Sequence, residues 1–210
     1  MVKAILFDFW GTLVEQGVWS PVKQVKNILG IGMPFPEYIT RMETAFMTQE
    51  FPSLKEGFEN LCLEFGLTPQ PEKIEELIGL WNKSWMLAEP YTETLEVLKK
   101  LRENHQLILI CNADGFSVNQ VLDKFGLRCV FDRIFFSYEL GLIKTDKLFM
   151  KNVLNHLSLN PEDCLLVGDS IQSDIIPGRR ADLDVVLVDR RNNRNFHPKI
   201  KNLNDLGKLL

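Results

Sequence analysis

Three polar residues, Asp8, Asn112 and Asp169, stand at or just beyond the ends of apolar runs that are typical of buried strands. In an open α/β sheet, ligands bind beyond the carboxyl ends of the strands, so reactive side chains are expected at these positions. A carboxylate at such a position can act as a nucleophile. A helix cap or a turn explains any one of these residues equally well, whereas the set of three predicts one converging site.

Asp174 adds a third carboxylate, in a loop that is expected to run from Asp169 into a helix. Three unpaired carboxylates in one cleft would repel one another, and a hard divalent cation with oxygen ligands removes that repulsion. Mg²⁺ is therefore the predicted cofactor. Lys144, which precedes another expected helix, would add a fixed positive charge. Gly11, three residues after Asp8, permits an abrupt turn and is expected to leave backbone amides free to face an anion.

The elements that must position these residues follow an alternating pattern. Short runs rich in Ile, Leu, Val and Phe are typical of strands buried on both faces, and amphipathic segments of helical length lie between the later runs. This alternation predicts βαβ units and a mostly parallel sheet, which is an α/β fold. The expected strands are 4–7, 107–111, 134–137, 164–167 and 185–188, and the expected helices are 92–104, 116–125, 146–156 and 171–180.

Residues 15–89 depart from this alternation. They contain no clear strand but do show helical periodicity, as in Phe58, Leu61, Cys62 and Phe65. We interpret them as an inserted all-helical subdomain, with residues 1–14 and 90–210 forming the core. The alternative is that these helices pack on the same core as the rest of the chain.

Composition excludes several classes of protein. The chain has 210 residues, 45% of them apolar and 25% charged, with a formal net charge of −4. This composition excludes collagen-like and disordered chains, and it offers no global attraction to nucleic acid. An anionic ligand must therefore be held by a local site. Arg190, Arg191 and Arg194 are expected to be solvated.

The cysteines and the N-terminal residues indicate in which cellular compartment the protein is expected. Four cysteines without a CxxC pair argue against a zinc site or a redox motif. The opening apolar stretch is only about eight residues long and carries Asp8, too short for a secretory leader or a membrane span. We expect a soluble cytoplasmic protein without a membrane partner, and composition leaves both a monomer and a homodimer open.

Four segments, in chain order, resemble the motifs of the haloacid dehalogenase superfamily of aspartate-nucleophile hydrolases. They are Ile5 to Leu13, Leu109 to Asn112, Lys144, and Val167 to Asp174. The resemblance covers nearly the whole chain. It implies a Rossmann-like core, with residues 15–89 as a helical cap that closes over the site.

The resemblance also implies roles for single residues. In the phosphatase branch, Asp8 attacks the phosphoryl group and forms a covalent aspartyl intermediate that water hydrolyses. Asp8, Asp169 and the backbone carbonyl of Trp10 would hold Mg²⁺, and Asp174 would orient a metal-bound water. Lys144 would neutralise charge on the phosphoryl oxygens. The residues expected to contact the phosphoryl group are Gly11, Thr12, Cys111, Asn112 and Lys144.

Two positions depart from the phosphatase pattern. Trp10 stands where these phosphatases usually carry a second Asp that acts as general acid and base, and Cys111 replaces a Ser or Thr. Indole cannot transfer a proton at working pH, and general acid and base help is typically worth about 10² to 10⁴ in rate. Alkyl phosphates are therefore expected to be poor substrates, and aryl or acyl phosphates better ones.

Trp10 also keeps other reactions open. Haloacid dehalogenases have an aromatic residue at this position and bind no metal, and Arg41 is a possible counterpart of their substrate-binding Arg. Phosphonatases need a cap lysine, for which Lys23, Lys26 and Lys55 are available. A catalytically weak protein that binds a phosphorylated ligand or a partner is the third alternative. Because three carboxylates are costly to hold together without a cation, we favour a Mg²⁺-dependent phosphatase that acts on a small phosphorylated metabolite.

Overall fold

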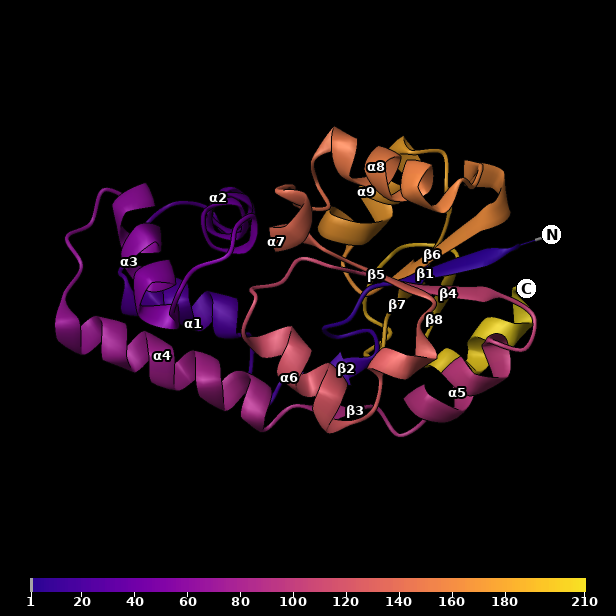
Figure 1. Ribbon diagram of the computed structural model, residues 1–210, viewed down its shortest axis with the longest axis horizontal. Coiled ribbons are helices and arrows are strands. Elements are labelled where there is room, and N and C mark those ends of the chain that lie inside the picture. Colours follow the sequence, from indigo (N-terminus) through magenta and orange to yellow (C-terminus); the bar gives the residue numbers. More distant parts are fainter. Residues whose placement is uncertain (1) are drawn as a thin grey trace.

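A computed structural model describes residues 2–210, and its centre is a six-stranded sheet with the strand order β5-β4-β1-β6-β7-β8. All neighbouring strands in this sheet are parallel, and helices cover both of its faces (Figure 1). The predicted α/β, Rossmann-like fold is confirmed. The strands are β1 (Ala4–Phe7), β2 (Val14–Glu15), β3 (Glu89–Pro90), β4 (Gln106–Cys111), β5 (Arg133–Phe136), β6 (Cys164–Gly168), β7 (Asp184–Val188) and β8 (Lys199–Ile200).

Strand β1 lies at the centre of the sheet because both of its faces are apolar. Ile5 and Phe7 belong to the hydrophobic cluster on one face, and Ala4 and Leu6 belong to the cluster on the other. This division follows the two-residue period of a strand. All four side chains are inaccessible to solvent. A continuous apolar run is thus the expected sequence of a strand at this position.

The helices around the sheet are α5 (Thr94–Leu101), α6 (Ser117–Lys124), α7 (Ser137–Leu140), α8 (Lys147–Leu157) and α9 (Ile176–Arg180). Four of these five helices overlap the predicted ones, with shifted ends, whereas α7 was not predicted. Ser137 was expected in a strand but begins α7. The predicted helix 171–180 is divided into a π-helical turn, Ile171–Ile175, followed by α9. Pro177 lacks the amide that a continuous helix would require there.

Four helices lie to one side of the sheet: α1 (Pro21–Ile28), α2 (Phe35–Met47), α3 (Leu54–Glu64) and α4 (Pro71–Met86) (Figure 1). They enclose a hydrophobic cluster separate from the two that flank the sheet. Phe46 stacks on Phe58, and the Trp81 ring meets both rings edge-on. We call α1 to α4 the cap. No helix within residues 2–210 is both long and apolar enough to cross a membrane.

A short antiparallel ribbon connects the cap to the sheet. Val14 pairs with Pro90, and Glu15 pairs with Glu89. The expectation that residues 15–89 contain no strand is wrong at both ends, because two-residue strands are too short to show periodicity. The predicted boundaries of the cap, 14/15 and 89/90, fall within this ribbon, and the division into two domains there stays a prediction.

Candidate active site

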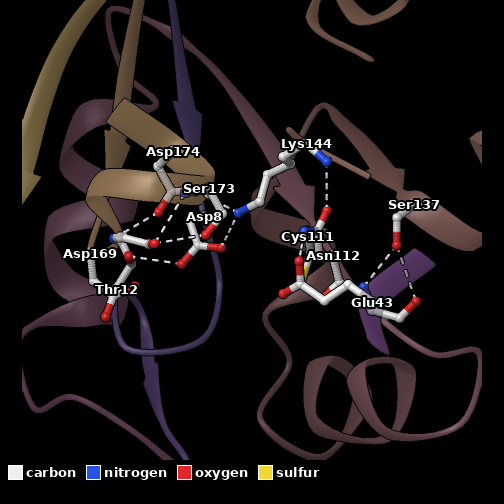
Figure 2. A network of polar contacts seen from close by, with 12 residues as sticks. Asp8, Thr12, Glu43, Cys111, Asn112, Ser137, Lys144, Asp169, Ser173 and Asp174 are labelled. Atoms are coloured by element: carbon white, nitrogen blue, oxygen red, sulfur yellow. Dashed lines mark hydrogen bonds and ion pairs between the residues drawn. The ribbon is translucent and has the colours of Figure 1, made fainter. Parts of the chain in front are cut away.

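The carboxyl ends of β1, β4 and β6 meet at one edge of the sheet, on the side that faces the cap. Asp8 follows β1, Asn112 follows β4 and Asp169 follows β6. Phe7, the last residue of β1, pairs with Leu109 of β4 and with Val167 of β6, so these three strands end within two residues of one another. Figure 2 shows the side chains of this edge and the contacts that join them.

Asp8, Asp169 and Asp174 form a cluster of carboxylates. One oxygen from each residue lies within 4.8 Å of the others. The cluster depends on Gly11, which has φ of +81° and lies so close to Asp169 that a Cβ atom there would be 2.5 Å from Oδ2. Only glycine combines this backbone conformation with such a close approach. Gly168 lies equally close to Asp174, although its φ is not in the left-handed region.

Lys144 lies between two of these carboxylates. Its Nζ donates to Asp8 Oδ1 at 2.6 Å and to Asp174 Oδ1 at 2.5 Å. The lysine is almost completely buried, with 2% of its surface exposed. Burial by itself lowers the pKa of Lys144, but the charges of Asp174 and Asp8 outweigh burial and raise the pKa well above its usual value. Lys144 is thus a fixed positive charge beside Asp8.

A single ammonium does not balance three carboxylates. Burial and the charges of Asp8 and Asp174 raise the pKa of Asp169 to about 8. Burial also raises the pKa of Asp174, to about 6, with Lys144 opposing and Asp8 reinforcing the shift. Such shifts indicate that further positive charge would be bound favourably. Three carboxylates grouped in this way have the oxygen chemistry that Mg²⁺ requires, so these residues fit the predicted metal.

Thr12 and Asn112 are close to the cluster and hold its members in position. Thr12 Oγ1 donates to Asp8 Oδ2 at 3.0 Å. Asn112 Oδ1 accepts from the backbone amide of Lys144 at 2.8 Å. Both side chains therefore orient the residues on which the reaction would depend, and their predicted contact with a phosphoryl group stays a prediction.

Three other predicted residues occupy different surroundings. Trp10 lines the cavity above the carboxylates. The amide of Gly11 donates to the carbonyl of Val14 at 2.8 Å, so this amide is engaged within the loop, and the expected contact of the loop's other amides with an anion stays a prediction. Cys111 is completely buried, and its thiol donates to the Asn112 carbonyl at 3.3 Å. Burial raises the pKa of this thiol well above its usual value, which keeps it protonated.

Arg41 does not line the cavity. Its guanidinium pairs with Glu64 at 2.8 Å and lies 4.8 Å from the ring centroid of Phe65. It thereby joins α2 to the end of α3. Within residues 2–210, Lys144 is the single basic residue among those that line the cavity, so the cap lysines considered above do not contribute to it.

The cavity lies between the cap and the core and has a volume of about 200 Å³. The carboxylates and Lys144 form its floor. Its opposite wall is mainly apolar, and the apolar residues that line the cavity are Trp10, Val22, Ile39, Met47, Trp81 and Trp85. A small ligand with one anionic end and an uncharged remainder matches this distribution.

Glu43 is a residue of this cavity that the sequence analysis missed. It lies on α2, and its Oε2 accepts a hydrogen bond from Asn112 Nδ2 at 2.9 Å (Figure 2). Burial raises its pKa to about 7; Lys144 and the bond from Asn112 oppose the shift, while Asp174 and Asp8 reinforce it. A signal was available, because Ile39, Glu43 and Met47 are spaced by four residues and so share one helix face.

Asp114 is a second residue that the sequence analysis missed, and it joins the cap to the core. Its Oδ2 accepts from the indole nitrogen of Trp81 at 3.0 Å and from Ser117 Oγ at 2.5 Å. Its Oδ1 accepts from the amides of Phe116 and Ser117, at the start of α6. One carboxylate thus connects α4 of the cap with α6 of the core.

Two arginines that were expected to be solvated also contact the site. Arg190 donates to the carbonyl of Thr12 at 2.7 Å, pairs with Glu93 at 2.8 Å and lies 3.2 Å from the ring centroid of Tyr91. Arg194 donates to the carbonyl of Asp169. The expectation of a solvated side chain is wrong for Arg190, which is partly buried, whereas Arg194 is exposed although it contacts the site. Both contacts arise because the loop after β7 folds back towards Thr12 and Asp169.

Comparison with known proteins decides the family. The model of the haloacid dehalogenase-like hydrolases matches residues 2–182. The chain belongs to the haloacid dehalogenase-like hydrolases. This resemblance, predicted from four short motifs, is therefore confirmed over most of the chain.

Relatives within this hydrolase family include phosphatases and dehalogenases. A glyceraldehyde 3-phosphate phosphatase of Methanopyrus kandleri is 24% identical over 95% of this chain and 89% of its own. A magnesium-bound hydrolase of the family from Bacillus subtilis matches with a TM-score of 0.69 and 19% identity, covering 100% of this chain and 98% of its own. The L-2-haloacid dehalogenase of Xanthobacter autotrophicus matches with a TM-score of 0.66 and 18% identity, at the same coverage. These structural matches establish the shared fold.

Proposed function

We propose that this hydrolase is a Mg²⁺-dependent phosphatase that acts on a small phosphorylated metabolite through an aspartyl-phosphate intermediate. The observation that carries the proposal is the grouping of Asp8, Asp169 and Asp174 within 4.8 Å of one another beside the buried Lys144. This site attracts a divalent cation, and with the cation bound it attracts a dianionic phosphoryl group.

Asp8 is the nucleophile in this proposal. Its Oδ2 accepts from Thr12 and its Oδ1 accepts from Lys144, so the carboxylate is held in one orientation below the cavity. Lys144 stabilises negative charge on the phosphoryl oxygens during transfer. Asp8, Asp169, Asp174 and the Trp10 carbonyl would hold Mg²⁺, which supplies further neutralisation of phosphoryl charge.

The similarity to a glyceraldehyde 3-phosphate phosphatase over 95% of this chain supports phosphatase activity. The cavity supports a substrate with one phosphoryl group, since Lys144 is the single basic residue among the lining residues of the described chain. The four cysteines are free thiols, three of them buried, which supports a reducing compartment such as the cytoplasm.

Dehalogenation is the second candidate, and one observation favours it. Trp10 lines the cavity and places an aromatic ring where dehalogenases carry one. Two observations oppose it: Arg41 is paired with Glu64 outside the cavity, and the carboxylate cluster is suited to a metal that dehalogenases do not use. Release of halide from 2-chloro- or 2-bromo-acids in EDTA would establish this alternative.

The test of the proposed function is turnover of p-nitrophenyl phosphate and acetyl phosphate with Mg²⁺ and with EDTA. We expect turnover that requires Mg²⁺ and falls by at least about 10³-fold in Asp8→Asn, since the nucleophile is lost. Turnover that survives either EDTA or Asp8→Asn would contradict the proposal. Glu37→Gln, which changes an exposed cap carboxylate, is the control.

A further inference from the structure

Hydrolysis of an alkyl phosphate needs a group that carries a proton. When the bond between phosphorus and the alcohol oxygen breaks, the alcohol leaves as a strong base unless a proton reaches it. Trp10 cannot supply this proton, because an indole N–H does not titrate near neutral pH. Asp8, Asp169 and Asp174 are committed to nucleophilic attack and to metal binding in the proposed function.

Glu43 is the single carboxyl group that the cap contributes to the cavity, among the residues that the structure describes. Its neighbours one turn away on α2, Ile39 and Met47, line the same cavity. The carboxyl group therefore faces the cavity from the wall opposite the nucleophile. A leaving group bound above the phosphoryl group would lie between Asp8 and this wall.

Asn112 joins Glu43 to Lys144 through two hydrogen bonds, and a third bond joins Lys144 to Asp8. Its Oδ1 accepts from the backbone amide of Lys144 at 2.8 Å, and this bond leaves Nδ2 free to donate to Glu43 at 2.9 Å. The side chain of Lys144 then holds Asp8 at 2.6 Å. The carboxyl group of Glu43 is thus fixed relative to the attacking oxygen, as a catalytic acid requires.

We infer that Glu43 is the general acid and base of this hydrolase, in place of the carboxylate that Trp10 replaces, and that the enzyme can therefore use alkyl phosphates. The inference rests on the proposed function. In the first step, Asp8 forms a bond to phosphorus, the bond to the alcohol oxygen breaks, and the proton of Glu43 moves to that oxygen. In the second step, water adds to phosphorus, the bond to Asp8 breaks, and one water proton returns to Glu43.

The electrostatic surroundings of Glu43 suit both steps. Its pKa of about 7 results first from burial, and the charged groups that face it are Lys144, Asp174 and Asp8. At neutral pH such a group is present in both the acidic and the basic form, which is the condition for efficient proton transfer in either direction. Its exposed surface faces the cavity, so a bound substrate can reach it.

The experiment compares two substrates of similar size, p-nitrophenyl phosphate and benzyl phosphate, in the wild-type protein and in Glu43→Gln. p-Nitrophenolate leaves without a proton, whereas benzyl alcohol needs one. We expect Glu43→Gln to slow the first release of benzyl alcohol in a single turnover by about 10²-fold or more, and that of p-nitrophenol by less than about tenfold. The second step also needs Glu43, so p-nitrophenol should appear as a burst of one equivalent followed by slow turnover.

Three comparisons make the result decisive. Glu37→Gln, on the exposed face of α2, should match the wild type. Glu43→Asp should recover part of the loss, and Glu43→Gln should remove the basic limb of the pH profile with benzyl phosphate. Equal effects of Glu43→Gln on both first-release rates would overturn this inference alone. Absence of Mg²⁺-dependent turnover of p-nitrophenyl phosphate by the wild type would overturn the proposed function, and this inference with it.

Discussion

The indole nitrogen of Trp81 in the cap donates a 3.0 Å hydrogen bond to Asp114 in the core. The two residues lie on α4 and on the loop before α6, and Asp114 also accepts from the first amides of α6. A hydrogen bond to a buried carboxylate is stronger than one between neutral groups. This contact therefore fixes the wall of the cavity to the loop that follows Asn112.

Trp81→Phe should destabilise the protein by about 1.5 to 3 kcal/mol, because it removes a donor from a buried carboxylate. Trp85→Phe is the matched control. The Trp85 indole donates to Asn82 within the same helix and is only partly buried. Urea denaturation followed by circular dichroism gives both values. An equal loss of stability in the two variants would show that ring packing, and not the bond to Asp114, accounts for the effect.

Gly11→Ala should weaken both folding and Mg²⁺ binding. A Cβ atom at Gly11 would meet Asp169, and φ of +81° is strained for alanine. Gly30→Ala is the control, since Gly30 has φ of +68° with no atom within 4 Å of the added Cβ. The control should lose about 1 to 2 kcal/mol of stability from backbone strain.

Gly11→Ala should lose more stability than this control. Calorimetric titration with Mg²⁺ should also show a weaker affinity in Gly11→Ala and an unchanged affinity in Gly30→Ala. An unchanged Mg²⁺ affinity in both variants would show that Gly11 does not contribute to Mg²⁺ binding.

Arg190→Ala should cost about 1.5 to 3 kcal/mol, because Arg190 donates to the Thr12 carbonyl and pairs with Glu93 in a partly buried position. Arg128→Ala removes an exposed pair with Asp123 and should cost about 0 to 1 kcal/mol. Arg190→Lys should recover only part of the loss, since an ammonium cannot reproduce the forked geometry. Thermal denaturation of the three variants provides the comparison.

Without metal, the stability of the protein should fall as the pH rises from about 4 to about 8. The pKa of Asp169 is raised from 3.8 to about 8, and that of Asp174 from 3.8 to about 6. In this range the folded state binds more protons than the unfolded state, so deprotonation favours unfolding.

Mg²⁺ should oppose this loss, and its stabilising effect should be larger at pH 8 than at pH 5. Melting temperatures measured across this range in EDTA and in Mg²⁺ provide the test. A stabilisation by Mg²⁺ that did not change with pH would contradict the assignment of the carboxylates to the metal.

Much of the fold could be predicted because its signals are local. An apolar run such as Ala4–Phe7 indicates a strand that is buried on both faces. The residue after the run is then expected at the carboxyl end of that strand. The ends of helices were less predictable. Asp146 was expected to be the first residue of a helix, but its side chain caps α8, which begins one residue later. Pro177 interrupts a segment whose amphipathic pattern predicts one continuous helix.

The missing parts of the site depend on contacts between distant residues. Glu43 meets Asn112 across 69 positions, and Arg190 meets Glu93 across 97. The local sequence of Arg190 does not differ from that of a solvated charge, and the only local signal for Glu43 is that it shares a helix face with Ile39 and Met47. The surroundings of both residues exist only once the chain is folded. Side-chain type and spacing thus predicted the floor of the site, and the three-dimensional arrangement was needed to identify its opposite wall.

The pairing of Val14 with Pro90 has a consequence for how the cap of this enzyme can vary in evolution. The two crossings between sheet and cap are hydrogen-bonded neighbours, so the inserted helices begin and end at the same place. A segment attached in this manner can be lengthened, shortened or exchanged without separating the strands beneath it. Asp8 and Lys144 can therefore be inherited intact while a new set of helices adapts the enzyme to another substrate.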